Sequence, residues 1–278
     1  MIVIGAPRSG TTLMTELLEG LGVFMGWRQD PNREASLFLR ADAELMRRMG
    51  ASWDRPEPLR CSFADRARRA KAVALARRRL RGPWAVLYLG PGRLLARTPA
   101  RLGGPWGWKD PRSTFTLPVW LELLPAARVV HVVRHGIDVA AGYVTGPRIG
   151  VAGIERPWAI RPRRRQQSMS LLDGLELWDA YVEEASRHAS ELGPRAHTVR
   201  FETLCAHPAA AIEGLAAFLG AEGEPGRVSA LAELVEGTRA LAHAHNPRLM
   251  AAAEPHAELL GRHGYAPGRS GAGPIRNR

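Results

Sequence analysis

The sequence is poor in cysteine and in long apolar runs. Its 278 residues include two cysteines, Cys61 and Cys205, which are too few for a disulfide framework and favour a reducing, cytoplasmic setting. No run of about eighteen apolar residues is present, so no transmembrane helix is expected. Residues 1–4 run straight into a glycine turn with no basic segment before them, so we expect no signal peptide. These features argue against a disulfide-rich secreted domain and against a membrane-spanning protein.

Lysine is also scarce, because arginine replaces it almost everywhere. Only Lys71 and Lys109 are lysines, so arginine supplies 37 of the 39 basic residues in a chain of net charge +12. Beside many alanines and glycines, this skew favours compositional bias over a nucleic-acid surface, although an anionic partner stays open. The basic helix expected over residues 64–80 has no nucleic-acid motif and no interleaved aromatics. We therefore expect no nucleic-acid partner, and interpret that helix as a solvated face or a lip that attracts acidic acceptors.

What the sequence does contain is an alternation of strand and helix patterns. This alternation predicts an α/β fold of the P-loop-like kind, with a parallel sheet between helices. Residues 1–265 are expected to form one domain, followed by a disordered Gly/Pro/Arg-rich tail over 266–278. The predicted strands are 1–4, 128–133, 196–201 and a short one at 243–245. The predicted helices are 11–21, 41–49, 64–80, 116–124, one starting at 137, 170–192 and 208–219.

The first chemical signal is the loop of residues 5–12, G-A-P-R-S-G-T-T, between a strand and a helix. Its two glycines let the backbone aim several N–H groups at one anion, and the helix N-terminus adds partial positive charge. A nucleoside-triphosphate loop would carry lysine where Thr11 stands, and the loop's cation, Arg8, lies nearer its start. The loop thus suits one phosphate-like group better than a triphosphate, which argues against a kinase.

This loop resembles the 5′-phosphosulfate loop of the sulfotransferases, P-[KR]-[SG]-G-T-[TS]. The resemblance implies that 3′-phosphoadenosine 5′-phosphosulfate (PAPS) is the co-substrate. Because a sulfuryl group carries less charge than a phosphoryl group, we expect its transfer to need no divalent metal. It also implies that Arg8 neutralises the bridging oxygen as the sulfuryl group departs. The residues that it assigns to the 5′-phosphosulfate are Pro7, Arg8, Ser9, Gly10, Thr11 and Thr12.

A second anion element follows the strand predicted at 128–133. Arg134 ends that strand, where its guanidinium points into the crevice in which such folds bind ligands. The segment resembles the 3′-phosphate element of sulfotransferases, R-[DN]-x-x-D-V-x-x-S, in which Arg134 would hold the 3′-phosphate. The family serine falls on Gly142, which removes one hydroxyl. Tyr143, Thr145 or the basic stretch 161–165 are candidate substitutes.

Three further segments resemble bacterial sulfotransferases, and the matches together run from residue 2 to about residue 220. They are W-K-D-P-R at 108–112, L-E-L-W-D-A-Y-V at 175–182, and R-F-E-T-L at 200–204. The resemblance implies that Lys109 stabilises the leaving group, with packing on Trp106 or Trp108 as the alternative role. Nothing in the sequence names the acceptor, for which a small molecule or a glycan carrying a hydroxyl or amine is expected. The irregular stretch 148–167 is where we expect acceptor choice to lie.

The general base has two candidates. Glu34 occupies the region where heparan-type sulfotransferases carry a catalytic glutamate, and Asp110 adjoins Lys109. Either carboxylate could instead be a salt-bridged structural group. His243 and His245 have no carboxylate at matching spacing, so we expect no metal site there.

Three alternative functions stay open at this point. One is a P-loop nucleotide-dependent small-molecule kinase, against which Thr11 speaks. Another is a non-catalytic polyanion-binding protein that uses the arginine-rich surface. The third is a degenerate sulfotransferase that binds nucleotide without turnover, which Gly142 suggests.

Overall fold

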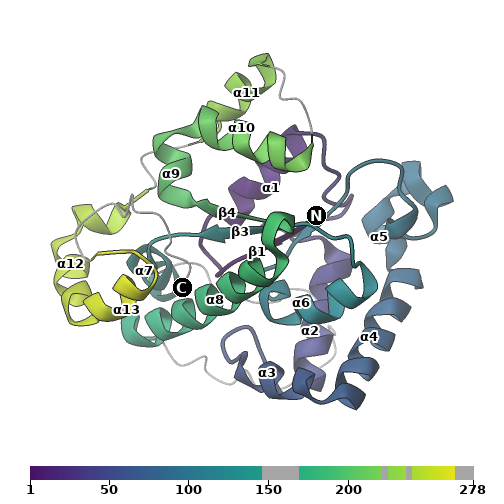
Figure 1. Cartoon of the computed structure of the whole chain (residues 1–278), viewed down its shortest axis with the longest axis horizontal. Coiled ribbons are helices and arrows are strands. Elements are labelled where there is room, and N and C mark those ends of the chain that lie inside the picture. Colours follow the sequence, from purple (N-terminus) through teal and green to yellow (C-terminus); the bar gives the residue numbers. More distant parts are fainter. Residues whose placement is uncertain (146–168, 221–224, 236–239, 267–278) are drawn as a thin grey trace.

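The computed structural model describes residues 1–145, 169–220, 225–235 and 240–266. Within these residues four parallel strands form one sheet in the order β2-β1-β3-β4, so the predicted α/β class with a parallel sheet is confirmed (Figure 1). The strands are β1 (Ile2–Ile4), β2 (Trp108–Lys109), β3 (Val129–Val133) and β4 (Ala196–Arg200). The expectations for 148–167 and for the tail at 267–278 lie outside the described residues.

Helices cover both faces of the sheet, as βαβ connections require. In chain order they are α1 (Thr11–Gly20), α2 (Ser36–Arg48), α3 (Glu57–Ala64), α4 (Arg66–Arg81), α5 (Ala85–Leu89), α6 (Ser113–Leu123), α7 (Gly136–Thr145), α8 (Leu171–Leu192), α9 (Phe201–Ala206), α10 (Pro208–Leu219), α11 (Pro225–Ala232), α12 (Pro247–Ala253) and α13 (Ala257–Arg262). None of the helices among these residues is long and apolar enough to cross a membrane.

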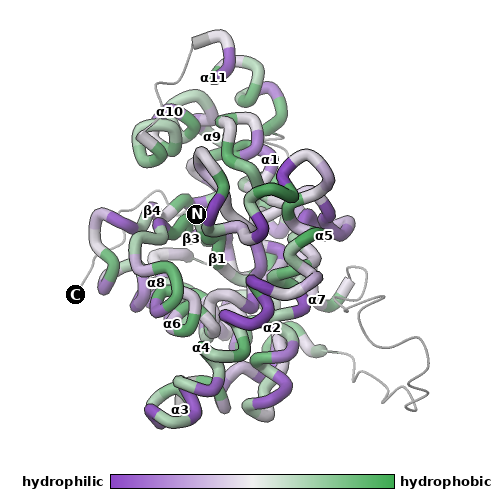
Figure 2. The backbone as a smooth tube through the Cα atoms, turned by 90° about the vertical axis from the view of Figure 1, so that its right-hand side faces the viewer, coloured by the Kyte–Doolittle hydropathy of each residue, from purple (hydrophilic) through white to green (hydrophobic). Residues whose placement is uncertain are grey.

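The core divides between the two faces because successive strand residues point to opposite sides. Ile2 and Ile4 pack in the cluster that includes side chains of α2, α4 and α6, whereas Val3 packs with α1, α10 and α11. All five residues of β3 are buried, which is why its sequence reads as a continuous apolar run rather than an alternating one. Figure 2 shows the hydrophobic strands at the centre of the molecule.

Some predicted boundaries differ from the structure. The helix expected at 41–49 begins at Ser36, and the one expected at 116–124 begins at Ser113, so Pro118 lies inside a helix rather than in its first turn. The strand predicted at 243–245 is wrong. That segment is a 3-10 helix, η5 (Ala242–His245), because the carboxylate of Asp138 accepts the backbone N–H groups of residues 242 and 243 and holds the chain in a turn.

The carboxyl ends of parallel strands lie at the same edge of a sheet. Here that edge carries the glycine loop after β1, the segment from Asp110 to Arg112 after β2, and Arg134 after β3. Lys109 is the last residue of β2 and lies at the same edge. Sequence segments more than one hundred residues apart therefore meet on one side of the molecule.

Candidate active site at the carboxyl edge of the sheet

The loop between β1 and α1 packs so closely that its two glycines are required. Gly5 has φ 137°, and a Cβ there would lie 2.3 Å from the carbonyl oxygen of Val132. Gly10 has φ 95°, and a Cβ there would lie 2.3 Å from Cδ2 of Phe201. Both backbones adopt conformations that only glycine accepts without strain. The loop is thus pressed against β3 on one side and against the start of α9 on the other.

Arg8 sits at the tip of this loop with φ 72°, a left-handed conformation that is uncommon for a residue with a side chain. Such strain persists where the surroundings impose it, and it clusters at binding sites. The Nε of Arg8 donates to the carbonyl oxygen of Gly142 at 3.3 Å. A hydrogen bond therefore links the two anion elements that the sequence places 134 positions apart.

The loop hydroxyls bond within the protein. Ser9 Oγ donates to the carbonyl of Ala6 at 2.7 Å, and Thr12 Oγ1 donates to the carbonyl of Asn32 at 3.2 Å. Backbone N–H groups of the first turn of α1 have no partner inside the helix, as at any helix start. The loop thus offers N–H groups and the positive end of a helix dipole, with Ser9 holding the turn in shape.

Arg134 lies at the end of β3 as predicted. Its NH2 and Nε donate to Oδ2 of Asp138 at 3.0 and 3.3 Å, and its guanidinium lies 4.7 Å from the ring centroid of Phe201. Because the same ring packs against Gly10, Phe201 stands between the loop and Arg134. Of the proposed serine substitutes, Thr145 bonds within its own helix, and Tyr143 has a buried hydroxyl without a partner among the described residues. Residues 161–165 are not among those residues.

The two other predicted catalytic residues meet in a buried ion cluster. Lys109, whose side chain is 2% exposed, donates from Nζ to Oε1 of Glu34 at 3.1 Å. Arg112 donates from NH2 to Oε2 of the same carboxylate at 2.9 Å, and from Nε to Oδ1 of Asp110 at 3.0 Å. Both oxygens of Glu34 are thus bonded to cations, and Arg112 bridges the two candidate bases.

Asp110 is the most perturbed member of this cluster. It is fully buried, its Oδ2 has no partner within the described part of the chain, and burial raises its pKa well above the usual range. The positive charge of Arg112 opposes this rise, while the negative charges of Glu34 and Asp42 add to it. Asp110 therefore keeps its proton to higher pH than an exposed aspartate does.

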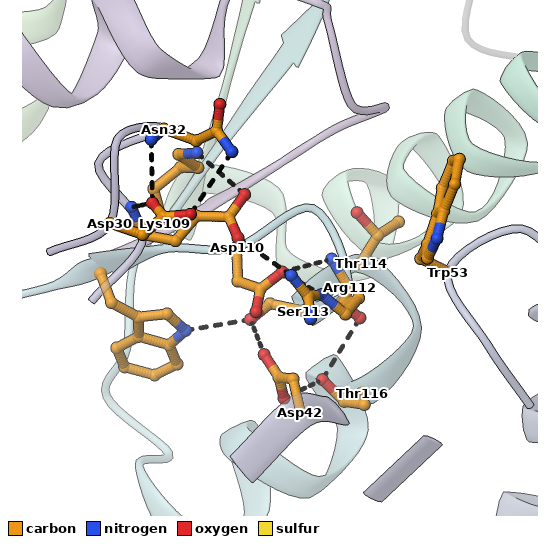
Figure 3. Close-up of polar contacts among 12 residues, drawn as sticks. Asp30, Asn32, Asp42, Trp53, Lys109, Asp110, Arg112, Ser113, Thr114 and Thr116 are labelled. Atoms are coloured by element: carbon orange, nitrogen blue, oxygen red, sulfur yellow. Dashed lines mark hydrogen bonds and ion pairs between the residues drawn. The ribbon is translucent and has the colours of Figure 1, made fainter. Parts of the chain in front are cut away.

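A second buried carboxylate, that of Asp42, forms hydrogen bonds with residues that follow the Lys109–Arg112 segment (Figure 3). Asp42, on α2, accepts hydrogen bonds from Ser113 Oγ at 2.6 Å, Thr116 Oγ1 at 2.7 Å and Trp120 Nε1 at 2.8 Å. The indole of Trp108 in turn donates to Ser113 Oγ at 2.9 Å. This network ties α2, α6 and β2 together directly beneath Lys109 and Asp110.

Sequence reasoning missed three contributors to the site. The matched segment at 108–112 contains Arg112 but implies no role for it, and no sequence pattern points to Thr114, whose Oγ1 accepts the Gly5 N–H at 3.1 Å. The sequence does indicate Asp42, because this residue lies on the apolar face of α2 together with Phe38 and Leu45. A carboxylate at such a position has to be hydrogen-bonded inside the core.

Among the described residues, no group of three or more His, Cys, Asp or Glu side chains is placed to hold a metal ion. His243 instead pairs with Asp138, a carboxylate that is distant in sequence and that spacing alone could not reveal. The expectation that the reaction needs no metal stays a prediction.

Comparison with models of protein families gives a match over most of the chain. A sequence model described as "Sulfotransferase family" matches residues 1–225. No match was found among curated proteins.

Three solved structures that resemble the chain have low identity. The sulfotransferase domain of the Synechococcus PCC 7002 olefin synthase is 20% identical, with 90% of this chain and 81% of that chain covered and a TM-score of 0.46. The sulfotransferase domain from the curacin biosynthetic pathway is 19% identical, with 86% and 78% covered and a TM-score of 0.49. A sulfotransferase from Mycobacterium avium is 14% identical, with 93% and 76% covered and a TM-score of 0.43.

Proposed function

Because this chain belongs to the sulfotransferase family, we propose that it moves a sulfuryl group from PAPS to a hydroxyl or amine of a small-molecule or glycan acceptor. The observation that carries the proposal is the adjacency of the two anion elements. Arg8 in the N-terminal loop touches Gly142 in the element that begins with Arg134, and Phe201 lies between the loop and Arg134. One adenosine ligand with a phosphate at each end would engage both elements.

The residues present fit such a ligand. The loop combines free helix-start N–H groups with the guanidinium of Arg8, the donor set that phosphate and sulfate groups prefer. Gly142 lies directly beside the side chain of Arg8, since a Cβ there would meet Arg8 atoms at ordinary contact distances of 3.4 to 3.5 Å. PAPS, when bound, would supply the sulfuryl group and a stable phosphate leaving group.

The chain's own residues then have distinct tasks. Arg8 and the N–H groups of residues 10–12 hold the 5′-phosphosulfate while Ser9, bonded to Ala6, keeps the loop turned, and Arg134 holds the 3′-phosphate. Lys109 neutralises charge on the leaving oxygen, and Glu34 accepts the acceptor's proton at a carboxylate oxygen. Since Glu34 Oε1 is bonded to Lys109, a move of Nζ away from Glu34 would free that oxygen. The same move would therefore make the Lys109 ammonium group available to the leaving oxygen and Glu34 Oε1 available to the acceptor's proton.

Asp110 is the rival base, and two features favour Glu34 over it. Asp110 is fully buried, whereas Glu34 is 7% exposed. A proton from an acceptor in solvent therefore reaches Glu34 more directly. We assign Asp110 to holding Arg112.

Binding is tested by isothermal titration calorimetry with adenosine 3′,5′-bisphosphate in the absence of magnesium. We expect tight binding that weakens strongly in Arg8→Ala, since one charge-assisted phosphate contact contributes about 1.5–3 kcal/mol. Preference for magnesium-ATP would overturn the proposal in favour of a kinase. Equal, salt-sensitive binding of any polyanion, indifferent to Arg8→Ala, would favour the polyanion-binding alternative.

Turnover is tested by transfer of labelled sulfate to a panel of hydroxyl and amine acceptors. Glu34→Gln should lower kcat by about 10²–10⁴ while bisphosphate binding is retained. Glu16→Gln is a matched control, because Glu16 is also ion-paired to an arginine near the loop, but on the partly exposed side of α1. An equal loss in both variants would show that Glu34 is not the base. The cytoplasmic setting and the lack of a nucleic-acid partner stay predictions.

A further inference from the structure

The C-terminal segment reaches back to the second anion element. Residues 240–266 lie beyond the part of the chain that the family model matches, which ends at residue 225. In Figure 1 the helices of this segment, α12 and α13, lie beside α7 and α8. The nearest approach to the site is η5, where His243 is 1% exposed and packs its ring on His135 with centroids 3.9 Å apart.

Asp138 joins this segment to Arg134. Its Oδ1 accepts hydrogen bonds from the backbone N–H of His243 at 2.8 Å and from His243 Nδ1 at 2.9 Å. Its Oδ2 accepts from Arg134 and, at 3.3 Å, from the backbone N–H of Ala242. One carboxylate group is therefore shared between the C-terminal segment and the guanidinium predicted to hold the 3′-phosphate.

The protonation state of this pair follows from its surroundings. Hydrogen bonds from His243 and the charge of Arg134 outweigh burial and lower the pKa of Asp138 to about 2, so the carboxylate is ionised at neutral pH. An ionised carboxylate only accepts hydrogen bonds, so the hydrogen between the two side chains belongs to His243 Nδ1. The imidazole thus fixes the rotation of the carboxylate and, through it, the direction in which Arg134 points.

We propose that His243 is a positioning residue for the 3′-phosphate site, acting on Arg134 through Asp138. The inference rests on the proposed function, because it assumes that Arg134 holds the 3′-phosphate. The second anion element is then completed by a histidine from the C-terminal segment, which bonds to Asp138. The backbone of Arg134 is held independently, since its carbonyl accepts from Trp178 Nε1 at 3.0 Å. His243 therefore acts on the side chain of Arg134 rather than on its backbone.

The test measures affinity for two ligands that differ only in the 3′-phosphate. Adenosine 3′,5′-bisphosphate and adenosine 5′-monophosphate are titrated into the full chain and into His243→Ala. We expect the dissociation constant of the bisphosphate to rise by about tenfold, equivalent to ~1.4 kcal/mol, while that of the monophosphate changes less than about twofold. His245→Ala is the matched control, because His245 is the exposed histidine of the same turn.

Two further variants separate positioning from folding. His243→Asn keeps a side-chain N–H donor near the position of Nδ1, so it should recover most of the bisphosphate affinity. In a double-mutant cycle, His243→Ala should have little further effect once Arg134 is replaced by alanine, because both changes remove the same interaction.

The outcomes distinguish this inference from the proposed function. If the unmodified chain does not bind the bisphosphate, the proposed function fails and this inference fails with it. If the unmodified chain binds it but His243→Ala binds equally well, only this inference is overturned. An equal loss for both ligands, or full additivity with Arg134→Ala, would show a structural role and would also overturn it.

Discussion

Replacing Arg112 by methionine should destabilise the protein in a pH-dependent way. Arg112 donates to Asp110 from its backbone N–H at 2.9 Å and from Nε at 3.0 Å, and its side chain is 11% exposed. Methionine has comparable length without charge, so the change removes a cation from beside two carboxylates. Glu34 keeps Lys109 as a partner, whereas Asp110 keeps only the backbone N–H of residue 112.

The size of the effect depends on whether Asp110 is ionised. Burial raises the pKa of Asp110 in the folded state above its value of roughly 3.9 in the unfolded chain. The stability that this difference contributes is complete below the unfolded-state pKa and is lost as pH rises through the folded-state pKa. Without Arg112 the folded-state pKa rises further, so more stability is lost at high pH. We expect a loss of about 3–5 kcal/mol where Asp110 would ionise, and about 1–3 kcal/mol where it is protonated.

The assay is urea unfolding of the original chain and of Arg112→Met over a series of rising pH values, up to the highest at which the original chain stays folded. The destabilisation should grow as pH rises through the folded-state pKa of Asp110. In the double variant Arg112→Met/Asp110→Asn the pH dependence of the difference should disappear, because residue 110 can no longer ionise. Equal destabilisation across the whole series, or a pH dependence that survives Asp110→Asn, would refute the reasoning.

Three other predictions follow from single contacts. Gly10→Ala should lower stability by several kcal/mol in thermal unfolding and prevent bisphosphate binding, because the new Cβ would lie 2.3 Å from Phe201. The control Gly22→Ala, at φ 89° with nothing within 4 Å of the new Cβ, should cost only about 1–2 kcal/mol of backbone strain. Similar losses in the two variants would contradict the packing argument. Gly142→Ser should fold normally, because its Cβ fits beside Arg8 at 3.4 Å. It should bind the bisphosphate at least as tightly in calorimetry, because the hydroxyl restores the serine of the sulfotransferase 3′-phosphate element. Weaker binding would show that the glycine is required. The low pKa of Asp138, about 2 in the folded state, contributes stability that is present above about pH 4 and is lost as pH falls toward that value. Asp138→Asn should therefore be less stable at neutral pH, and its stability should fall less steeply with acid. The same dependence of stability on pH in both chains would contradict this prediction.

The sequence predicts the framework of this fold well because the framework depends on local patterns. The continuous valine-rich run of β3 and the strand-loop-helix pattern of residues 2–20 are each visible within a short window. The N-terminus of α8 is also local, since Ser170 and Asp173 form a capping box within one turn.

The contacts that assemble the site are less predictable, since they join distant segments. The sequence points to Glu34 and to Lys109 separately, but their ion pair spans 75 positions and depends on how two distant segments pack. The strand predicted at 243–245 failed for the same reason. Its backbone donors are satisfied by Asp138, 105 residues earlier, so the turn is set by tertiary contact rather than by local propensity.

The buried cluster also explains how carboxylates can lie in a site built for anions. With Glu34 and Asp110 both ionised, the charges of Lys109 and Arg112 would be cancelled, and the pocket would offer an anion little attraction. Burial favours the protonated form of Asp110, and in that form the cluster around Lys109 and Arg112 carries one negative charge fewer. Asp110 then contributes a hydrogen-bond acceptor to Arg112 rather than a further negative charge, so the ionised form of Glu34 needed for a base adds less repulsion toward a bound anion. An Asp110→Asn variant that keeps the geometry should therefore bind the bisphosphate as well as the original chain does, whereas weaker binding would mean that Asp110 acts as an anion.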